Sequence, residues 1–418
     1  MSESPTVEAN RHEIPEKRRQ AHVDWLLGVT QVPTATGREH RVIAWIDRWL
    51  AGRDGIEKRV DAHGNIELSL KDAPTTDHPV YFTAHLDHPA FVVEQIVDPN
   101  ELILSFRGGV MSDYFPDAEI RLHNSENGFT TATIVEEHDP DGKAWSETET
   151  RPFKMYRAKS GQPHAASVGD IGTWALPDAE IVDDEFGGII HTNACDDLAA
   201  VAAALCAFDE IRMAQENGSD RNDVRVLFTL AEEIGFIGAI GASRDGFMPK
   251  GSRIIALENS RAFPDSPIHG GPIVRVGDRI SVFSPELTGA VAKVAERIAG
   301  GPAQPTASQK QSDMPKWKWQ RKLMAGGACE ASVYCAYGYT STCVCLPLGN
   351  YHNMAGLTEA QAGTHEGAPR VGREYVGIDD FHGMVDLLIG CGMDLPQSPG
   401  FIERVEKLWN ERKFVIGS

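Results

Sequence analysis

The sequence lacks the features of a membrane, secreted or nucleic-acid-binding protein. No apolar run approaches the ~18 residues that a transmembrane helix requires, and residues 1–20 are polar, without the apolar core and cleavage site of a secretory signal. Basic residues are in the minority, since 40 Lys and Arg stand against 60 Asp and Glu and the net charge is −20. A surface of that sign disfavours binding to a polyanion. We therefore expect a cytoplasmic protein with no membrane and no nucleic acid partner.

Cysteine is also scarce. The 418 residues include seven cysteines, an odd number, and most of them lie in apolar stretches. This pattern predicts reduced, buried thiols and not a disulfide framework. Hydrophobic residues make up 41% and charged residues 24% of the chain, as in ordinary globular proteins. The length favours two or three domains.

Two kinds of hydrophobic pattern divide the chain. Short alternating runs, separated by Gly, Pro, Asn and Asp, extend from about residue 91 to about residue 190 and predict an all-β insert. On either side of the insert, the periods of the hydrophobic pattern predict alternating strands and helices, which indicates an α/β domain. This domain comprises residues 1–90 and 191–418, and the insert, residues 91–190, splits it. The expected helices lie within 23–52, with a break at 32–37, and at 197–214, 285–299 and 378–391, and the expected strands at 65–70, 79–86, 224–231, 253–257 and 342–346.

Two of the apolar strands lead into side chains that bind metals in other proteins. His85 and Asp87 come at the end of a buried strand and share one of its faces, so that the carboxylate can orient the imidazole. Glu232 and Glu233 follow another apolar strand, at the sheet edge where open α/β folds place their sites. Each pair taken alone also has an ordinary explanation, a buried His–Asp pair or a solvated loop. Two buried carboxylates side by side, however, require a cation.

Three further segments also place potential metal-binding side chains next to apolar elements. Asp196 and Asp197 come at the start of an Ala-rich helix, Glu258 ends an apolar strand, and His352 follows another apolar strand. Acidic residues are routine at the start of a helix, but the combined set of His and carboxylates suits Zn, Co or Mn. Two divalent ions need one shared carboxylate, and each needs one His and one further carboxylate. A metal site is the economical interpretation, and Glu232, beside Glu233, is a candidate general base.

These clusters resemble those of the co-catalytic metallo-aminopeptidases, the family that includes the glutamyl aminopeptidases and the tetrahedral TET enzymes. The resemblance runs from about residue 23 to about residue 391 and implies a zinc-peptidase-like (phosphorylase/hydrolase-like) α/β fold. That fold has a mixed sheet flanked by helices and a small β-barrel-like insert that aids assembly. Further segments that carry the resemblance, in the family's order, are residues 33–39, 61–65, 167–170, 270–272 and 327–331.

The resemblance also implies roles for the residues and a reaction. Asp196 bridges two metal ions, with His85 and Glu258 on the first and Glu233 and His352 on the second. Asp87 orients His85, and Glu232 is the general base. The implied enzyme removes N-terminal residues from peptides with metal-activated water. It carries two divalent ions per chain, Zn before Co or Mn, and forms a homo-oligomer, from a dimer up to a dodecamer.

The sequence departs from the family's pattern beside the expected metals. The family usually has Arg at the position of Leu198, an acidic residue at His88 and Asp at Glu258, and its last His follows Arg-Tyr-X where this chain has Asn350-Tyr351. These departures leave two alternatives open. One is a related deacylase or a carboxypeptidase or dipeptidase on the same site, and the other is a non-catalytic binding or assembly protein with a decayed site. The insert precedes the Asp196 motif, which favours the aminopeptidase.

Other features are expected to be structural. Residues 316–322 form a basic run with interleaved aromatics, a composition that can stack nucleic acid bases. So short a run in an acidic chain favours a solvated loop or a subunit contact. His63, His138 and His269 are expected on the surface or in packing.

Overall fold

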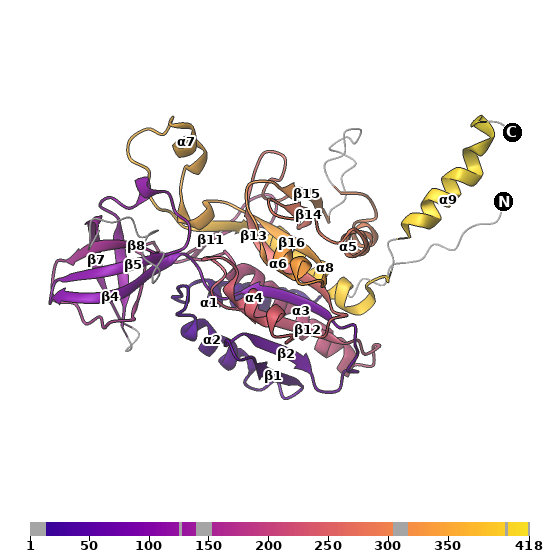
Figure 1. The fold of residues 1–418 in the computed structure, drawn as a ribbon, viewed down its shortest axis with the longest axis horizontal. Coiled ribbons are helices and arrows are strands. Elements are labelled where there is room, and N and C mark those ends of the chain that lie inside the picture. The colour runs from indigo at the N-terminus through magenta and orange to yellow at the C-terminus, as the bar shows by residue number, and fades with distance from the viewer. Residues whose placement is uncertain (1–13, 125–127, 139–152, 304–316, 398–399, 417–418) are drawn as a thin grey trace.

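The structure is a computed structural model, and it describes residues 14–124, 128–138, 153–303, 317–397 and 400–416. An eight-stranded sheet with helices on both faces forms the main body, and a closed barrel stands at one end of it (Figure 1). The expected fold class is thereby confirmed: a mixed sheet flanked by helices, with a small antiparallel barrel.

The large sheet has the strand order β1-β2-β12-β3-β13-β16-β14-β15. The four central strands, β12, β3, β13 and β16, are parallel, whereas β2 and β14 run antiparallel to their central neighbours. β12 is buried along its whole length, as expected for a parallel strand with both faces covered. The strands are β1 (Ile56–Val60), β2 (Ile66–Leu70), β3 (Val80–His85), β12 (Val224–Thr229), β13 (Arg253–Arg261), β14 (Ile273–Asp278), β15 (Gln320–Met324) and β16 (Thr340–Leu348).

Two apolar cores cover the two faces of this sheet. The larger core contains residues of α1, α2, α3, α5 and α8, and the smaller core contains residues of α4 and α6. Every residue from Leu198 to Asp209 of α3 is buried, because its alanines allow close contact with the sheet and with other helices at once. The helices are α1 (Glu16–Thr30), α2 (His40–Leu50), α3 (Leu198–Glu216), α4 (Ile237–Arg244), α5 (Pro285–Ala299), α6 (Glu330–Ala336) and α8 (Ile378–Asp394).

The barrel is inserted directly after the central strand β3. Its six strands close in the order β4-β5-β8-β7-β6-β9. An aromatic cluster fills it, in which the rings of Phe115 and Tyr156 stack 4.2 Å apart. The strands are β4 (Ala90–Asp98), β5 (Glu101–Arg107), β6 (Glu119–His123), β7 (Phe129–Glu137), β8 (Lys154–Ser160) and β9 (Ile171–Trp174), with the 3-10 turn η1 (Ser112–Tyr114) after β5.

A small sheet and two peripheral helices complete the described chain. β10 (Glu180–Val182), β11 (Ile189–Thr192) and β17 (Glu374–Gly377) form an antiparallel sheet. The 3-10 turn η4 (Tyr351–Asn353) and α7 (Leu357–Ala362) follow β16, and α9 (Phe401–Arg412) and η5 (Lys413–Ile416) follow α8.

The basic run turns out to be part of the sheet. Trp319 is only 1% exposed, its Nε1–H donates to the carbonyl of Gly301 at 3.2 Å, and β15 begins at the next residue. Residues 317–319 lead into β15 and residues 320–322 belong to it, so the run is not the solvated loop that was one of our two expectations. A subunit contact, the other expectation, stays a prediction. Lys316 lies outside the described residues.

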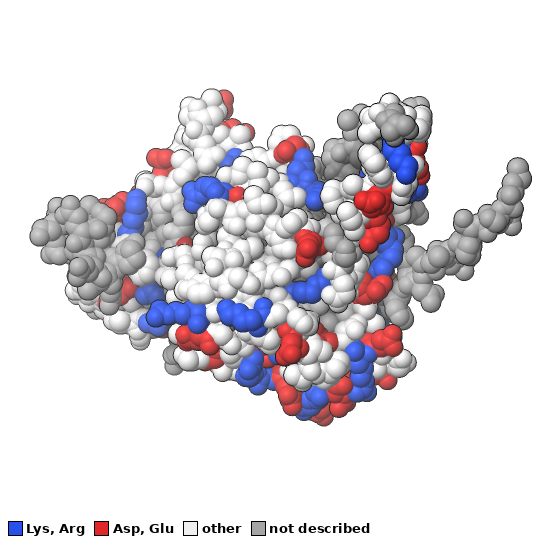
Figure 2. All heavy atoms as spheres, turned by 45° about the vertical axis from the view of Figure 1, so that its right-hand side comes forward, with Lys and Arg blue, Asp and Glu red and all other residues white. Residues whose placement is uncertain are grey.

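The expectation for cysteine is confirmed, since all seven cysteines are free thiols and six are buried. Among the described residues, no helix is both long enough and apolar enough to cross a membrane. On the face drawn in Figure 2, Lys and Arg are interspersed with Asp and Glu and do not gather into one basic patch.

Candidate metal centre

The carboxyl ends of the parallel strands bring the predicted ligands to one edge of the sheet. His85 is the last residue of β3, and Glu258 lies level with it on the neighbouring strand β13. Glu232 and Glu233 follow β12 after two residues, and His352 lies in η4, which follows β16 after two residues. The local reason is the same in each case: an apolar run forms a buried strand, and the first polar residues beyond it lie at its end.

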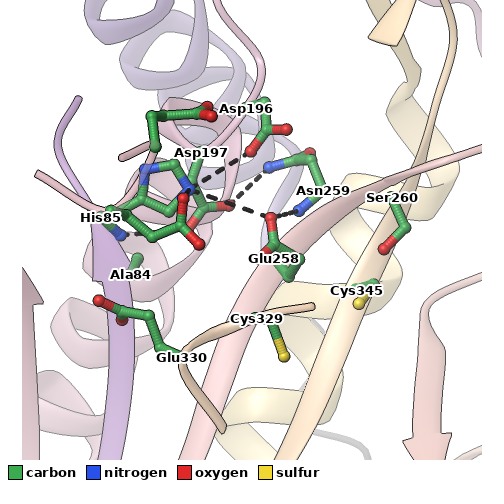
Figure 3. A network of polar contacts seen from close by, with 12 residues as sticks. Ala84, His85, Asp196, Asp197, Glu258, Asn259, Ser260, Cys329, Glu330 and Cys345 are labelled. Carbon is green, nitrogen blue, oxygen red and sulfur yellow. Dashed lines mark hydrogen bonds and ion pairs between the residues drawn. The ribbon is translucent and has the colours of Figure 1, made fainter. Parts of the chain in front are cut away.

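Asp196 precedes α3 and lies between the two histidines. Its Oδ1 is 3.4 Å from Nε2 of His85, and its Oδ2 is 3.5 Å from Nε2 of His352. Glu258 Oε1 is 4.0 Å from the same nitrogen of His85, and Glu233 Oε1 is 3.3 Å from that of His352. The first group, with His85, Asp196 and Glu258 pointing toward one another, is drawn in Figure 3. The five side chains thus form two groups that share Asp196.

Two oxygen atoms of this cluster have no hydrogen bond within the described protein. They are Oδ1 of Asp196 and Oε1 of Glu233, and both are buried. Burial raises the pKa of Glu258 well above its usual range, and the neighbouring Asp196 raises it further. Buried carboxylates of this density are costly unless a cation compensates them. The donor set, His and carboxylate, fits a pair of divalent ions of the Zn, Co or Mn type.

Backbone carbonyls fix the tautomers of the two histidines. Nδ1–H of His85 donates to the carbonyl of Asp87 at 3.1 Å, and Nδ1–H of His352 donates to the carbonyl of Gly109 at 2.6 Å. Because a carbonyl oxygen can only accept, Nδ1 carries the proton in both rings. Nε2 of each ring is therefore left to act as a ligand.

The carboxylate of Asp87 lies beside His85 but has other partners as well. Its Oδ1 is 3.5 Å from Nδ1 of His85, farther than the carbonyl of the same residue. It accepts hydrogen bonds from the hydroxyl of Thr36 at 2.7 Å and from the backbone N–H groups of Glu232 at 2.9 Å and Glu233 at 3.1 Å. Asp87 therefore fixes the turn that carries both glutamates, besides any contribution to His85.

Glu232 lies on the edge of the cluster. Its Oε2 is 3.8 Å from Nε2 of His85. The residue as a whole is 8% exposed. Burial raises its pKa well above the usual range, and the adjacent Glu233 and Asp87 add to the shift. A carboxyl group in this position can hold a proton beside the His–carboxylate cluster.

Comparison with known proteins identifies the family. The model of the M42 glutamyl aminopeptidase family matches residues 64–362, well over half of the chain. The chain belongs to the M42 glutamyl aminopeptidase family. It is accordingly a hydrolase of the aminopeptidase type, and the predicted resemblance is confirmed. No curated protein matches the sequence.

Solved structures share the M42 fold at low sequence identity. An aminopeptidase from the archaeon Desulfurococcus kamchatkensis is 17% identical with a TM-score of 0.67, over 93% of this chain and 98% of that one. The TET aminopeptidase of the archaeon Thaumarchaeota archaeon SCGC AB-539-E09 is 18% identical with a TM-score of 0.66, over 93% and 99%. The TET1 peptidase of Pyrococcus horikoshii is 17% identical with a TM-score of 0.65, over 90% and 100%.

One buried residue of this M42 chain that the sequence does not reveal is Glu374. Its Oε2 accepts the backbone N–H groups of Cys195 at 2.6 Å and Asp196 at 3.0 Å, and its Oε1 accepts the N–H of His352 at 2.8 Å. It is fully buried at the start of β17. It joins the loop before α3 to η4, the two segments that meet at the second ligand group. In the sequence it is a lone acidic residue with no recognisable pattern around it.

His88 has a comparable supporting position. Nδ1–H of His88 donates to the carbonyl of Asp196, and Nε2 is 3.0 Å from Oδ1 of Asn353. This departure from the family's pattern therefore contacts the backbone of the ligand loop. Leu198, a second departure, is wholly buried in the core.

A separate His–carboxylate group lies at the start of α8. Nδ1 of His269 is 2.6 Å from Oδ1 of Asp379, and Nε2 is 2.8 Å from Oδ2 of Asp184. Asp380 accepts the backbone N–H groups of His269 and Gly271. The acidic setting of His269 is not evident from the sequence, because the carboxylates come from distant segments.

Proposed function

We propose that the chain is a dinuclear metallo-aminopeptidase, which removes N-terminal residues from peptides. The observation that carries the proposal is the position of Asp196, one oxygen of which faces His85 and the other His352. Each histidine has one further carboxylate of its own, Glu258 or Glu233. This is the arrangement that two ions with a shared carboxylate require.

In this proposal His85 and Glu258 would hold one ion, Glu233 and His352 would hold the other, and Asp196 would be a ligand of both. Divalent ions held there, Zn before Co or Mn, would supply a Lewis acid for the scissile carbonyl and for a water molecule. The carboxylate of Glu232 accepts the proton of the attacking water and passes it to the leaving amine. Asp87 holds Glu232 in place through its backbone N–H.

Three of the departures from the family's pattern are compatible with metal-dependent peptide hydrolysis. His88 contacts the carbonyl of Asp196, and Leu198 lies in the core. The side chain of Asn350 donates to the carbonyl of Arg373 at 2.8 Å. All three therefore support the scaffold around the ligands. The family membership favours an aminopeptidase over a deacylase or carboxypeptidase, and the five converging ligands favour an enzyme over a decayed site.

The decisive experiment pairs short peptides with a free and an acetylated N-terminus. Metal-stripped protein is reloaded with Zn, Co or Mn, and the release of N-terminal residues is measured. We expect metal-dependent cleavage of the free peptides only. Cleavage confined to the acetylated peptides would instead assign a deacylase, and no cleavage of either kind would refute the proposal.

A substitution tests the assigned base. Glu232→Gln keeps the size of the side chain but cannot accept the proton of water, so we expect kcat to fall at least ~100-fold while bound metal, measured by elemental analysis, stays at the wild-type level. Glu57→Gln on β1, where the side chain is exposed, is the matched control. Near-normal turnover of Glu232→Gln would exclude it as the base.

We also propose a homo-oligomer in the cytoplasm. The TET1 peptidase of Pyrococcus horikoshii is described as assembling into a tetrahedron or a large octahedral shell, which supports self-assembly here. The division into residues 1–90 with 191–418 and an insert at 91–190 remains part of the same proposal. It is supported by the barrel strands, which run from Ala90 to Trp174.

A further inference from the structure

A cavity lies where the barrel meets the main body of the fold, outside the metal centre. Its volume is about 220 Å³, which is the space of about seven water molecules at ~30 Å³ each. Pockets for drug-sized ligands hold ~300–1,000 Å³, so this cavity suits a small metabolite and not a peptide. None of the five proposed metal ligands lines the cavity, and neither does Glu232.

The wall of this cavity is partly apolar. Val32 and Pro33, from the connection between α1 and α2, contribute to it, and so does Leu176, which follows β9. His88 and Asn353 also line the cavity, and Nε2 of His88 is 3.0 Å from Oδ1 of Asn353. Segments of the barrel and of the sheet domain thus enclose one space, and its occupant would contact both.

Strand β6 presents one cation to the cavity. Both neighbours of Arg121 on β6 are buried in the barrel core, so the alternation of the strand places Arg121 on the outer face of the barrel. Among the described residues of the lining, Arg121 is the only Lys or Arg. Its guanidinium lies 4.9 Å from the centre of the Phe129 ring, which also lines the cavity.

The partners of Arg121 leave its N–H groups available. The structure gives Arg121 no hydrogen bond to another described residue, and its ion pair with Asp178 spans 4.0 Å. The side chain of Asp178 is 93% exposed, and an exposed pair at this distance contributes little. The cavity therefore has a guanidinium that can bind an anion and, beside it, a carboxylate that can bind a cation.

The remaining polar groups of the lining add an acceptor and no further charge of note. Burial lowers the pKa of His123 to about 4, and Arg41 and Arg121 lower it further, so this ring is neutral at pH 7. Its Nε2 is 2.8 Å from the hydroxyl of Thr173. Oδ1 of Asn193 is buried and has no hydrogen bond within the described protein. A buried acceptor without a donor is costly, so an occupant with an N–H or O–H group would stabilise the site.

We propose that this cavity binds a free amino acid with an apolar side chain. The carboxylate of the amino acid binds the guanidinium of Arg121, whose N–H groups form a fork that matches it. The ammonium group faces Asp178, and the side chain contacts the apolar part of the wall. Because Arg121 and Asp178 are opposite in charge and 4.0 Å apart, a zwitterion complements both at once. The inference goes beyond the proposed function, of which such an amino acid would be a product.

Isothermal titration calorimetry on the full-length protein tests this site with three probes. They are L-leucine, 4-methylpentanoate, which is leucine without its amine, and isoamylamine, which is leucine without its carboxylate. We expect leucine to bind at least ~10-fold more tightly than either of the other two, since each of these lacks one charged contact. Arg121→Gln should weaken the binding of leucine about 10–100-fold, and Arg121→Lys, which keeps the charge without the fork, should weaken it less. Arg244→Gln, at the exposed end of α4, is the matched control.

Three results would overturn the inference. If leucine gives no heat of binding, the cavity holds water only. If Arg121→Gln, shown to be folded by circular dichroism, binds leucine as the control does, any leucine that binds lies elsewhere. If 4-methylpentanoate binds as tightly as leucine, the ammonium group is not recognised and the ligand is not an amino acid. Peptide cleavage is measured separately, so binding of leucine that depends on Arg121 in a protein that cleaves no peptide would refute the proposed function and leave this site standing.

Discussion

Substitution of Glu374 tests how the two halves of the metal centre are held together. In Glu374→Gln the amide keeps the shape of the side chain but has only one acceptor oxygen. If that oxygen keeps the N–H groups of Cys195 and Asp196, the NH₂ group faces the N–H of His352 and that hydrogen bond is lost. A hydrogen bond to a charged group contributes about 1.5–3 kcal/mol, and a buried N–H left without a partner costs a similar amount. We therefore expect the unfolding free energy to fall by about 2–4 kcal/mol.

The same variant is expected to weaken one metal site more than the other. In the dinuclear centre that we propose, His352 loses its anchor, so the ion assigned to His352 and Glu233 should dissociate first, with an affinity about 10–100-fold lower. Competition with a chelator of known affinity should then resolve two steps, where the wild type is expected to bind both ions tightly, and excess metal should restore most of kcat. Glu180→Gln, at an exposed position on β10, is the control. Wild-type affinity for both ions together with unchanged stability in urea would refute this account of Glu374.

Three further predictions follow from the same geometry. Removal of metal with a chelator should lower Tm, because the buried carboxylates then lose their cation, and addition of Zn should restore it. The same Tm with and without metal would contradict the proposal that this cluster binds divalent ions. Burial lowers the pKa of His269, but Asp379, Asp380 and Asp184 together raise it more, so the pKa lies above its usual value. The stabilising contribution of His269 is therefore complete below its unfolded pKa and is lost as the pH rises through the folded one. The Tm difference between wild type and His269→Ala should shrink from pH 6 to pH 9. In Gly349→Ala the added Cβ would lie 1.9 Å from the ring of Tyr375, so we expect a loss of at least ~1 kcal/mol in urea unfolding, and unchanged stability would show that the ring moves freely.

Much of the catalytic core is predictable because its signals are local. Buried parallel strands are apolar runs, and the residues just beyond them, such as His85 and Glu233, lie at one sheet edge whatever the loops do. The helix α3 is equally evident from its composition. These elements required no knowledge of long-range contacts beyond the rule that parallel strands align.

The elements that the sequence does not predict depend on distant partners. In α4, Gly238 and Gly241 lower the helix propensity, but a Cβ at Gly238 would lie 2.5 Å from the backbone of Leu230. Close packing therefore requires glycine where propensity argues against a helix. Glu374 reaches the metal centre only because β17 pairs with β11, where it lies opposite Thr192. The helix α9 is absent from the helices expected from the sequence, and none of its residues is buried in the described part of the chain.

The position of Gly109 gives the barrel a part in the metal centre. Gly109 lies between β5 and η1, and its carbonyl accepts Nδ1–H of His352, a residue of the sheet domain. That hydrogen bond fixes which nitrogen of His352 is free to bind metal, just as the carbonyl of Asp87 does for His85. One histidine is thus oriented by the connection that leads from β3 into the barrel and the other by a loop of the barrel itself. A barrel that served assembly alone would not need this contact, so the insertion after β3 also helps to orient one of the proposed ligands.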